Sequence, residues 1–210
     1  IYSSRRVLDM FINYEIIVRE IREPGVVYEG EDFRVRAFPL QHTKTCVGYT
    51  LEENPRPGAF NPDRAREMKV PCGPLWSRLQ AGETVKSEDG ADVRPEDVLG
   101  AARKGRKFSY VTDTRYTPSI AGEVAGSDLL VCEAMFENGL AETAIEKKHM
   151  TASQAGTIAR DAGVKKMALI HYSPRYTDND LKILLAEARE VFPETILSKD
   201  RMVLPIEYED

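Results

Sequence analysis

Four short, mainly apolar segments of this 210-residue chain each end on a side chain that can bind a metal ion or transfer a proton. His42, Asp113, Glu133 and His171 follow residues 33–41, 107–112, 129–132 and 166–170. In a layered α/β protein the carboxyl ends of neighbouring strands open onto a common crevice, so residues far apart in the sequence meet there. We therefore predict an α/β fold in which these four side chains converge. Imidazole and carboxylate donors together suit zinc or a similar divalent metal.

Each of these residues also has an ordinary structural interpretation. A histidine after a strand is more often a hydrogen-bonded structural residue than a ligand, Asp113 could turn the chain, and Glu133 could cap a helix. Their combination favours a functional site, because a chain with only 3 histidines places them at separate strand or helix ends.

Composition narrows the class of protein. The 29 basic and 34 acidic residues argue against a protein that coats nucleic acid through its overall charge. No apolar stretch approaches the roughly 18 residues that span a bilayer, and the first residues lack the layout of a signal peptide. We expect a cytoplasmic protein with no membrane partner. Cys46, Cys72 and Cys132 form no close pair, which predicts reduced thiols rather than a disulfide framework or a thiolate zinc site.

Alternating and helical patterns divide the chain into elements. Strands are predicted at residues 14–21, 33–38, 48–51, 108–112, 129–132, 167–170 and 202–206. A helix is predicted to begin at Thr151, where Thr151 and Gln154 form a capping box, and another spans residues 178–191 with one apolar face.

Residues 54–103 interrupt this core pattern with a stretch rich in Pro, Gly and charge. Helices are predicted at residues 62–68 and 75–79, and a hairpin at residues 83–90. Because the stretch is too long for a plain loop, we predict an arm that projects from a core made of residues 1–53 and 104–210. A merely decorative insertion is the alternative.

Several segments, in order, carry a family resemblance. They read LQHTKTCVGY from Leu40, GPLWSRLQAGETV from Gly73, GRKFSYVTDTR from Gly105, DLLVCEAMF from Asp128, HMTASQA from His149 and HYSPRY from His171. This order resembles the ribonuclease Z family of tRNA 3′-processing endonucleases, in the metallo-β-lactamase superfamily. The resemblance extends over nearly the whole chain from about Tyr14, and it implies an αββα sandwich, seen here mainly as its C-terminal half.

The resemblance also implies roles for individual residues. His42 and His171 would each bind one of two zinc ions, and Asp113 would bridge both. His149 would be the proton donor, with Glu133 beside it as a second catalytic residue, and Arg175 would lie near the scissile phosphate. The dipole of the helix that follows His149 disfavours a protonated ring, whereas Glu133 favours it, and we expect the carboxylate to prevail.

Two departures from the family pattern stand out. The segment that usually reads His-Glu-Ala-Thr has Cys132 in place of its histidine. The His-x-His-x-Asp-His motif, which supplies most zinc ligands and the general base, does not occur in this sequence. Because the chain also begins at Ile1 without methionine, we expect further sequence upstream of it.

The function implied is a zinc-dependent endoribonuclease that removes the 3′ trailer from precursor tRNA and leaves a 3′-hydroxyl. The arm would grip the tRNA elbow, often across a homodimer. One alternative is another hydrolase of the superfamily that acts on small esters or phosphodiesters. A second is a non-catalytic module that binds tRNA or dimerises.

Overall fold

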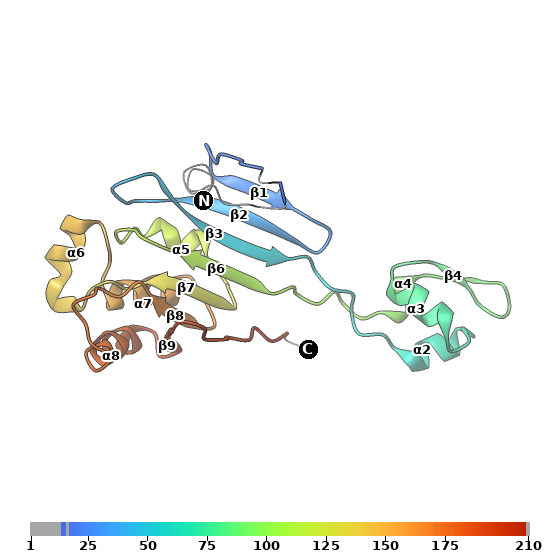
Figure 1. Cartoon of the computed structure of the whole chain (residues 1–210). Coiled ribbons are helices and arrows are strands. Elements are labelled where there is room, and N and C mark those ends of the chain that lie inside the picture. Colours follow the sequence, from blue (N-terminus) through green and yellow to red (C-terminus); the bar gives the residue numbers. More distant parts are fainter. Residues whose placement is uncertain (1–13, 16, 209–210) are drawn as a thin grey trace.

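A single seven-stranded sheet forms the centre of the computed structural model, which describes residues 14, 15 and 17–208 (Figure 1). Its strands, in spatial order, are β1 (Gly25–Glu29), β2 (Phe33–Leu40), β3 (Cys46–Glu53), β6 (Lys107–Val111), β7 (Leu129–Glu133), β8 (Met167–Ile170) and β9 (Thr195–Leu197). Neighbours from β1 to β6 pair antiparallel, and those from β6 to β9 pair parallel. The sheet is therefore mixed, and its parallel half brings strand ends to a common edge.

Helices cover one face of this sheet. α5 (Ser119–Glu123), α7 (Ala152–Asp161) and α8 (Leu181–Val191) enclose the main core with strand residues such as Phe38, Leu130 and Met167. At the edge lie a 3₁₀ turn (Asn138–Leu140) and α6 (Ala141–Lys147). Gly156 lets α7 and α8 approach closely, because a Cβ at this position would lie only 3.0 Å from the Ala188 carbonyl oxygen.

The opposite face of the sheet carries apolar side chains that are only partly buried. Register places Tyr49, Tyr110 and Val131 side by side on it. Within the described residues the chain thus forms one sheet-and-helix layer pair, which is half of the expected αββα arrangement. No helix among the described residues is long and apolar enough to cross a bilayer.

A separate small unit projects from the sheet at the end of a two-stranded neck (Figure 1). It contains α2 (Pro62–Glu67), α3 (Pro74–Gln80), β4 (Val85–Lys86), β5 (Asp92–Val93) and α4 (Pro95–Val98). Its own apolar cluster comprises Ala65, Val70, Leu79, Val85, Val93 and Val98, with Phe60 and Trp76 packed against it. We call residues 54–103 the arm.

Most predicted elements are present, and two are wrong. No strand forms at residues 14, 15 and 17–21, where Tyr14, Ile17 and Val18 are 63–67% exposed. Alternation shows which face a strand could bury, but a strand also needs a neighbour that supplies hydrogen bonds. No strand forms at residues 202–206 either, because Pro205 lacks an N–H and Val203 is exposed; the last strand is the unpredicted β9.

Candidate metal centre and active site

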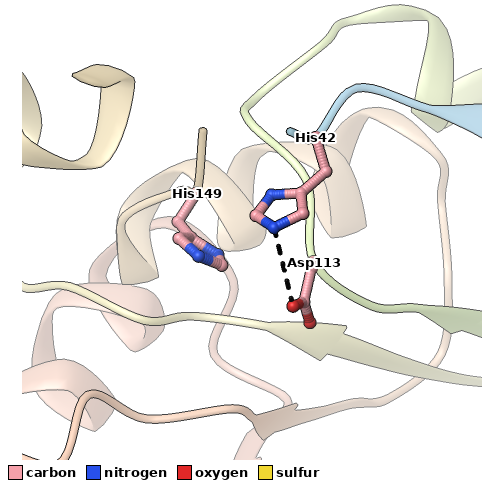
Figure 2. Close-up of side chains that lie close together, drawn as sticks. All are labelled: His42, Asp113 and His149. Atoms are coloured by element: carbon pink, nitrogen blue, oxygen red, sulfur yellow. Dashed lines mark ion pairs between the residues drawn. The ribbon is translucent and has the colours of Figure 1, made fainter. Parts of the chain in front are cut away.

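Three histidines and an aspartate meet at the C-terminal edge of the parallel strands (Figure 2 shows three of the four). His42 follows β2, Asp113 follows β6 and His171 directly follows β8. His149 lies between α6 and α7, and its ring centroid is 4.8 Å from that of His42 and 5.2 Å from that of His171. The structure thus brings together the three predicted ligands and the predicted proton donor.

Asp113 presents one carboxylate oxygen to His42 and the other to His171. Its Oδ2 lies 3.9 Å from His42 Nε2, and its Oδ1 lies 3.5 Å from His171 Nε2. Partial burial opposes ionisation of Asp113, but a hydrogen bond from Thr112 and the nearby histidine rings hold its pKa below the ordinary value of 3.8. The carboxylate is therefore charged near neutral pH and faces both imidazoles.

The tautomer of His42 follows from its one backbone contact. Its Nδ1 lies 3.0 Å from the carbonyl oxygen of Lys148. A carbonyl oxygen can only accept, so Nδ1 carries the proton and the Nε2 lone pair is directed towards Asp113. Such a hydrogen bond on the far ring nitrogen is the usual way in which proteins orient a histidine ligand.

His171 has an unusual backbone conformation. Its φ of 59° lies in the left-handed region, which side-chain-bearing residues seldom adopt. Conformations of this kind cost of order 1–3 kcal/mol and concentrate at functional sites. The turn directs the His171 ring towards Asp113 immediately after the end of β8.

Glu133 is fully buried and holds His149 in place. Its Oε1 accepts from Thr114 N at 2.6 Å and contacts His149 Nδ1 at 2.9 Å, while Oε2 accepts from Met150 N at 3.3 Å. These partners engage both carboxylate oxygens, so Glu133 fixes the position of the His149 ring. The hydrogen bond with Glu133 raises the pKa of His149 above its ordinary value of 6.5, against the opposing effect of burial. The hydrogen bond to the carboxylate thus outweighs the effect of burial.

Thr114 links three parts of the site and was not identified from the sequence. Besides the bond from its backbone N–H to Glu133, its hydroxyl accepts from Gln41 N at 2.9 Å and donates to the carbonyl oxygen of Arg115 at 2.9 Å. It thereby ties the loop that carries His42 to the end of β6. Its place beside Asp113 was the only local signal of this role.

Cys132 points away from the site. Successive side chains of a strand face opposite sides, so Cys132 enters the core while Glu133 meets His149. The Cys132 thiol lies 3.9 Å from Met150 Sδ, and burial raises its pKa well above 9.0. The departure from the family pattern at this position thus leaves the hydrogen bonds of Glu133 intact. All three cysteines of the chain are unpaired.

Arg175 lies at the margin of the site. Its Nε donates to Ser173 Oγ at 3.2 Å, and its guanidinium carbon is 5.2 Å from the ring centroid of Phe136. The same Phe136 ring is 6.3 Å from that of His149. Arg175 is therefore separated from His149 by one aromatic ring.

The donor set fits a metal centre. Candidate ligand atoms of His42, Asp113 and His149 lie within 4.8 Å of one another, as do those of Glu133, His149 and His171. Glu133 and His149 Nδ1 already bond each other, which leaves His42, Asp113, His171 and the Nε2 atom of His149 as candidate donors. Imidazole nitrogen with carboxylate oxygen is a donor set typical of catalytic zinc.

This fold and this donor set define the metallo-β-lactamase class. Residues 68–172 match the beta-lactamase superfamily domain. A metallo-beta-lactamase fold protein, YhfI, from Bacillus subtilis superposes with a TM-score of 0.54 at 15% identity, over 93% of this chain and 58% of its own. The short form of human tRNase Z superposes with a TM-score of 0.52 at 20% identity, over 88% of this chain and 47% of its own. At such identities the likeness establishes the fold.

Sequence relatives establish the family. The chain is 69% identical to ribonuclease Z of Treponema denticola and 62% identical to that of Treponema pallidum, over 99% of this chain and 68% and 67% of the relatives. It is 42% identical to ribonuclease Z of Methanosarcina acetivorans over 94% of this chain and 64% of the relative. The chain belongs to the ribonuclease Z family and spans about two thirds of the length of these relatives.

Proposed function

We propose that the protein is a zinc-dependent endoribonuclease that removes the 3′ trailer from precursor tRNA and leaves a 3′-hydroxyl on the tRNA. Membership of the ribonuclease Z family supports the substrate. The observation that carries the chemistry is the placement of Asp113 between His42 and His171, next to the buried pair of Glu133 and His149.

The metal-binding part of the proposal assigns two zinc ions. His42 and Asp113 would hold one, and Asp113 and His171 the other. When bound, two such ions supply polarisation of the phosphodiester and a water of lowered pKa. Zinc normally has about four ligands, so further donors are needed. The family resemblance assigns them to the His-x-His-x-Asp-His motif, which this sequence does not contain.

The proton-donating part assigns His149 as general acid. Glu133 holds Nδ1 and favours the protonated ring, so Nε2 can carry the proton that is given away. The leaving group in this hydrolysis is the 3′-oxygen of the tRNA, which needs a proton as the bond to phosphorus breaks. Arg175 would contact a phosphate through its planar set of donors.

The arm, the oligomeric state and the cellular location complete the proposal. The arm would bind the tRNA elbow, a role supported by its projection from the sheet (Figure 1). We assign a homodimer, in which the arm of one subunit serves the site of the other, and a cytoplasmic location, in keeping with three unpaired cysteines. Light scattering of the purified protein tests the dimer.

Cleavage of precursor tRNA by the full-length protein, meaning this chain with any upstream sequence that its gene encodes, tests the proposal when measured with and without a chelator. Asp113→Asn keeps the shape of the side chain but removes the charge that both metals would share, so we expect it to abolish cleavage. Glu146→Gln changes an exposed carboxylate on α6 and serves as the matched control. Hydrolysis of small esters without cleavage of precursor tRNA would instead support a different hydrolase of the superfamily.

A further inference from the structure

Residues 202–208, here called the C-terminal segment, contact the neck of the arm. The neck is a two-stranded ribbon, in which Arg56 N donates to Arg103 O at 2.8 Å and Arg103 N donates to Arg56 O at 2.9 Å. Its strands approach closely enough that a Cβ on Gly58 would lie 2.0 Å from the Gly100 carbonyl oxygen. An isolated two-stranded ribbon is only marginally stable, so its direction depends on lateral support.

Tyr208 supplies a contact to both strands at the base of this ribbon. The guanidinium carbon of Arg56, on the outgoing strand, lies 3.5 Å from the Tyr208 ring centroid. That of Arg106, on the returning strand, lies 4.1 Å from the same centroid. Within the described part of the chain, the buried Nε and Nη2 atoms of Arg56 have no hydrogen-bond partner. The ring face of Tyr208 is therefore a favourable contact for a guanidinium whose two buried nitrogens lack hydrogen bonds.

Arg106 fastens the same assembly to the sheet. Its Nε and Nη2 bond both carboxylate oxygens of Glu53, at the end of β3, over 2.5–3.1 Å. Its Nη1 donates to the carbonyl oxygen of Ile206 at 3.1 Å. One guanidinium thus joins the last residue of β3, the backbone of the C-terminal segment and the ring of Tyr208.

We propose that Tyr208 is a positioning residue that fixes the angle between the arm and the sheet, and hence between the arm and the metal centre. The inference rests on the proposed function, in which arm and metal centre engage one tRNA together. A small phosphodiester touches only the metal centre, so loss of the brace should affect the two substrates differently.

Spin labels on unnatural residues at Glu88 in the arm and Glu190 in α8, both exposed, report the angle in the full-length protein by double electron–electron resonance. Tyr208→Leu should broaden the distance distribution and raise KM for precursor tRNA about tenfold, while kcat/KM for bis(p-nitrophenyl) phosphate stays within about twofold. Tyr208→Phe keeps the ring over Arg56 and Arg106 and loses only the hydroxyl's hydrogen bond to Glu53, so it should broaden the distribution less than Tyr208→Leu does. Val203→Ala, at an 86% exposed position of the same segment, is the matched control.

Arg56→Gln removes the guanidinium that contacts the Tyr208 ring. It should also broaden the distribution of spin-label distances, which would show that the effect is not a folding defect peculiar to Tyr208→Leu. A distribution unchanged in both Tyr208→Leu and Arg56→Gln would overturn the brace, whatever the activity. Broadening without any change in KM for precursor tRNA would overturn its role in positioning the substrate. Failure of the unaltered protein to cleave precursor tRNA would refute the proposed function instead.

Discussion

Replacing His149 separates proton donation from metal binding. His149→Ala removes the ring held by Glu133 but none of the assigned ligands, so bound zinc should stay near the unaltered level. A positioned general acid contributes roughly 10²–10⁴-fold, and kcat on precursor tRNA should fall by that factor, or about 2.7–5.5 kcal/mol in activation free energy. His171→Ala removes a ligand and should instead lose metal.

The variant also leaves Glu133 short of one partner. Two backbone donors, Thr114 N and Met150 N, remain on a carboxylate that is 0% exposed. Losing a hydrogen bond to a buried group costs about 1–3 kcal/mol, so the melting temperature must be followed together with activity. His149→Asn offers an amide donor to Glu133 but no titratable proton. It should recover stability without recovering kcat.

Single-turnover cleavage and elemental analysis, measured on the same proteins, distinguish a proton donor from a metal ligand at His149. The assignment predicts that His149→Ala is slow and zinc-replete, and that His171→Ala is slow and zinc-poor. If both proteins were equally depleted of zinc, His149 would be a ligand and the division of roles would be wrong.

Three further predictions follow from other parts of the structure. Replacing residues 57–102 by two glycines, which can join Arg56 to Arg103 because these already pair at 2.8 Å, should weaken binding of precursor tRNA but spare hydrolysis of a small phosphodiester; equal loss of both would count against a binding role for the arm. The hydrogen bonds from Arg106 lower the pKa of Glu53 from 4.5 to about 2, so its contribution to stability is complete above about pH 5 and is lost as the pH falls towards 2. The free energy of unfolding of Glu53→Gln, measured with denaturant, should depend less on pH in that window than that of the unaltered protein. An identical pH dependence in the two proteins would contradict the ion pair. The 210-residue chain by itself should not cleave precursor tRNA, because its assigned ligands give each zinc fewer than about four donors; zinc-dependent cleavage by a chain verified to start at Ile1 would show that other ligands complete the site.

Local signals in the sequence identified much of the fold. The capping box of Thr151 and Gln154 forms as predicted, because both partners lie within one turn of the same helix. The apolar segments before Asp113, Glu133 and His171 are strands of one sheet for a similar reason, since each carries its own pattern. The strand predicted at residues 14–21 does not form at 14, 15 and 17–21, the residues described there, because pairing depends on a neighbour that alternation does not specify. β9, with 3 residues, is too short to show a period.

The site residues likewise include some that the sequence predicted and some whose roles depend on distant segments. The sequence placed His42, Asp113 and His171 at strand ends, and the sheet brings those ends together. It could not distinguish a ligand from a supporting residue at Glu133, because that depends on Thr114 and His149 approaching from other segments. Nor could it reveal Tyr208 beside Arg56, a contact between segments about 150 residues apart in the chain.

The chemistry of the new RNA ends tests the central claim most directly. Precursor tRNA cleaved by the zinc-loaded, full-length protein should yield a tRNA with a 3′-hydroxyl and a trailer with a 5′-phosphate, because water attacks the phosphorus and the 3′-oxygen departs. Asp113→Asn and chelation should each abolish the cut. A 2′,3′-cyclic phosphate on the tRNA, or cleavage that survives both treatments, would contradict metal-dependent hydrolysis at this site.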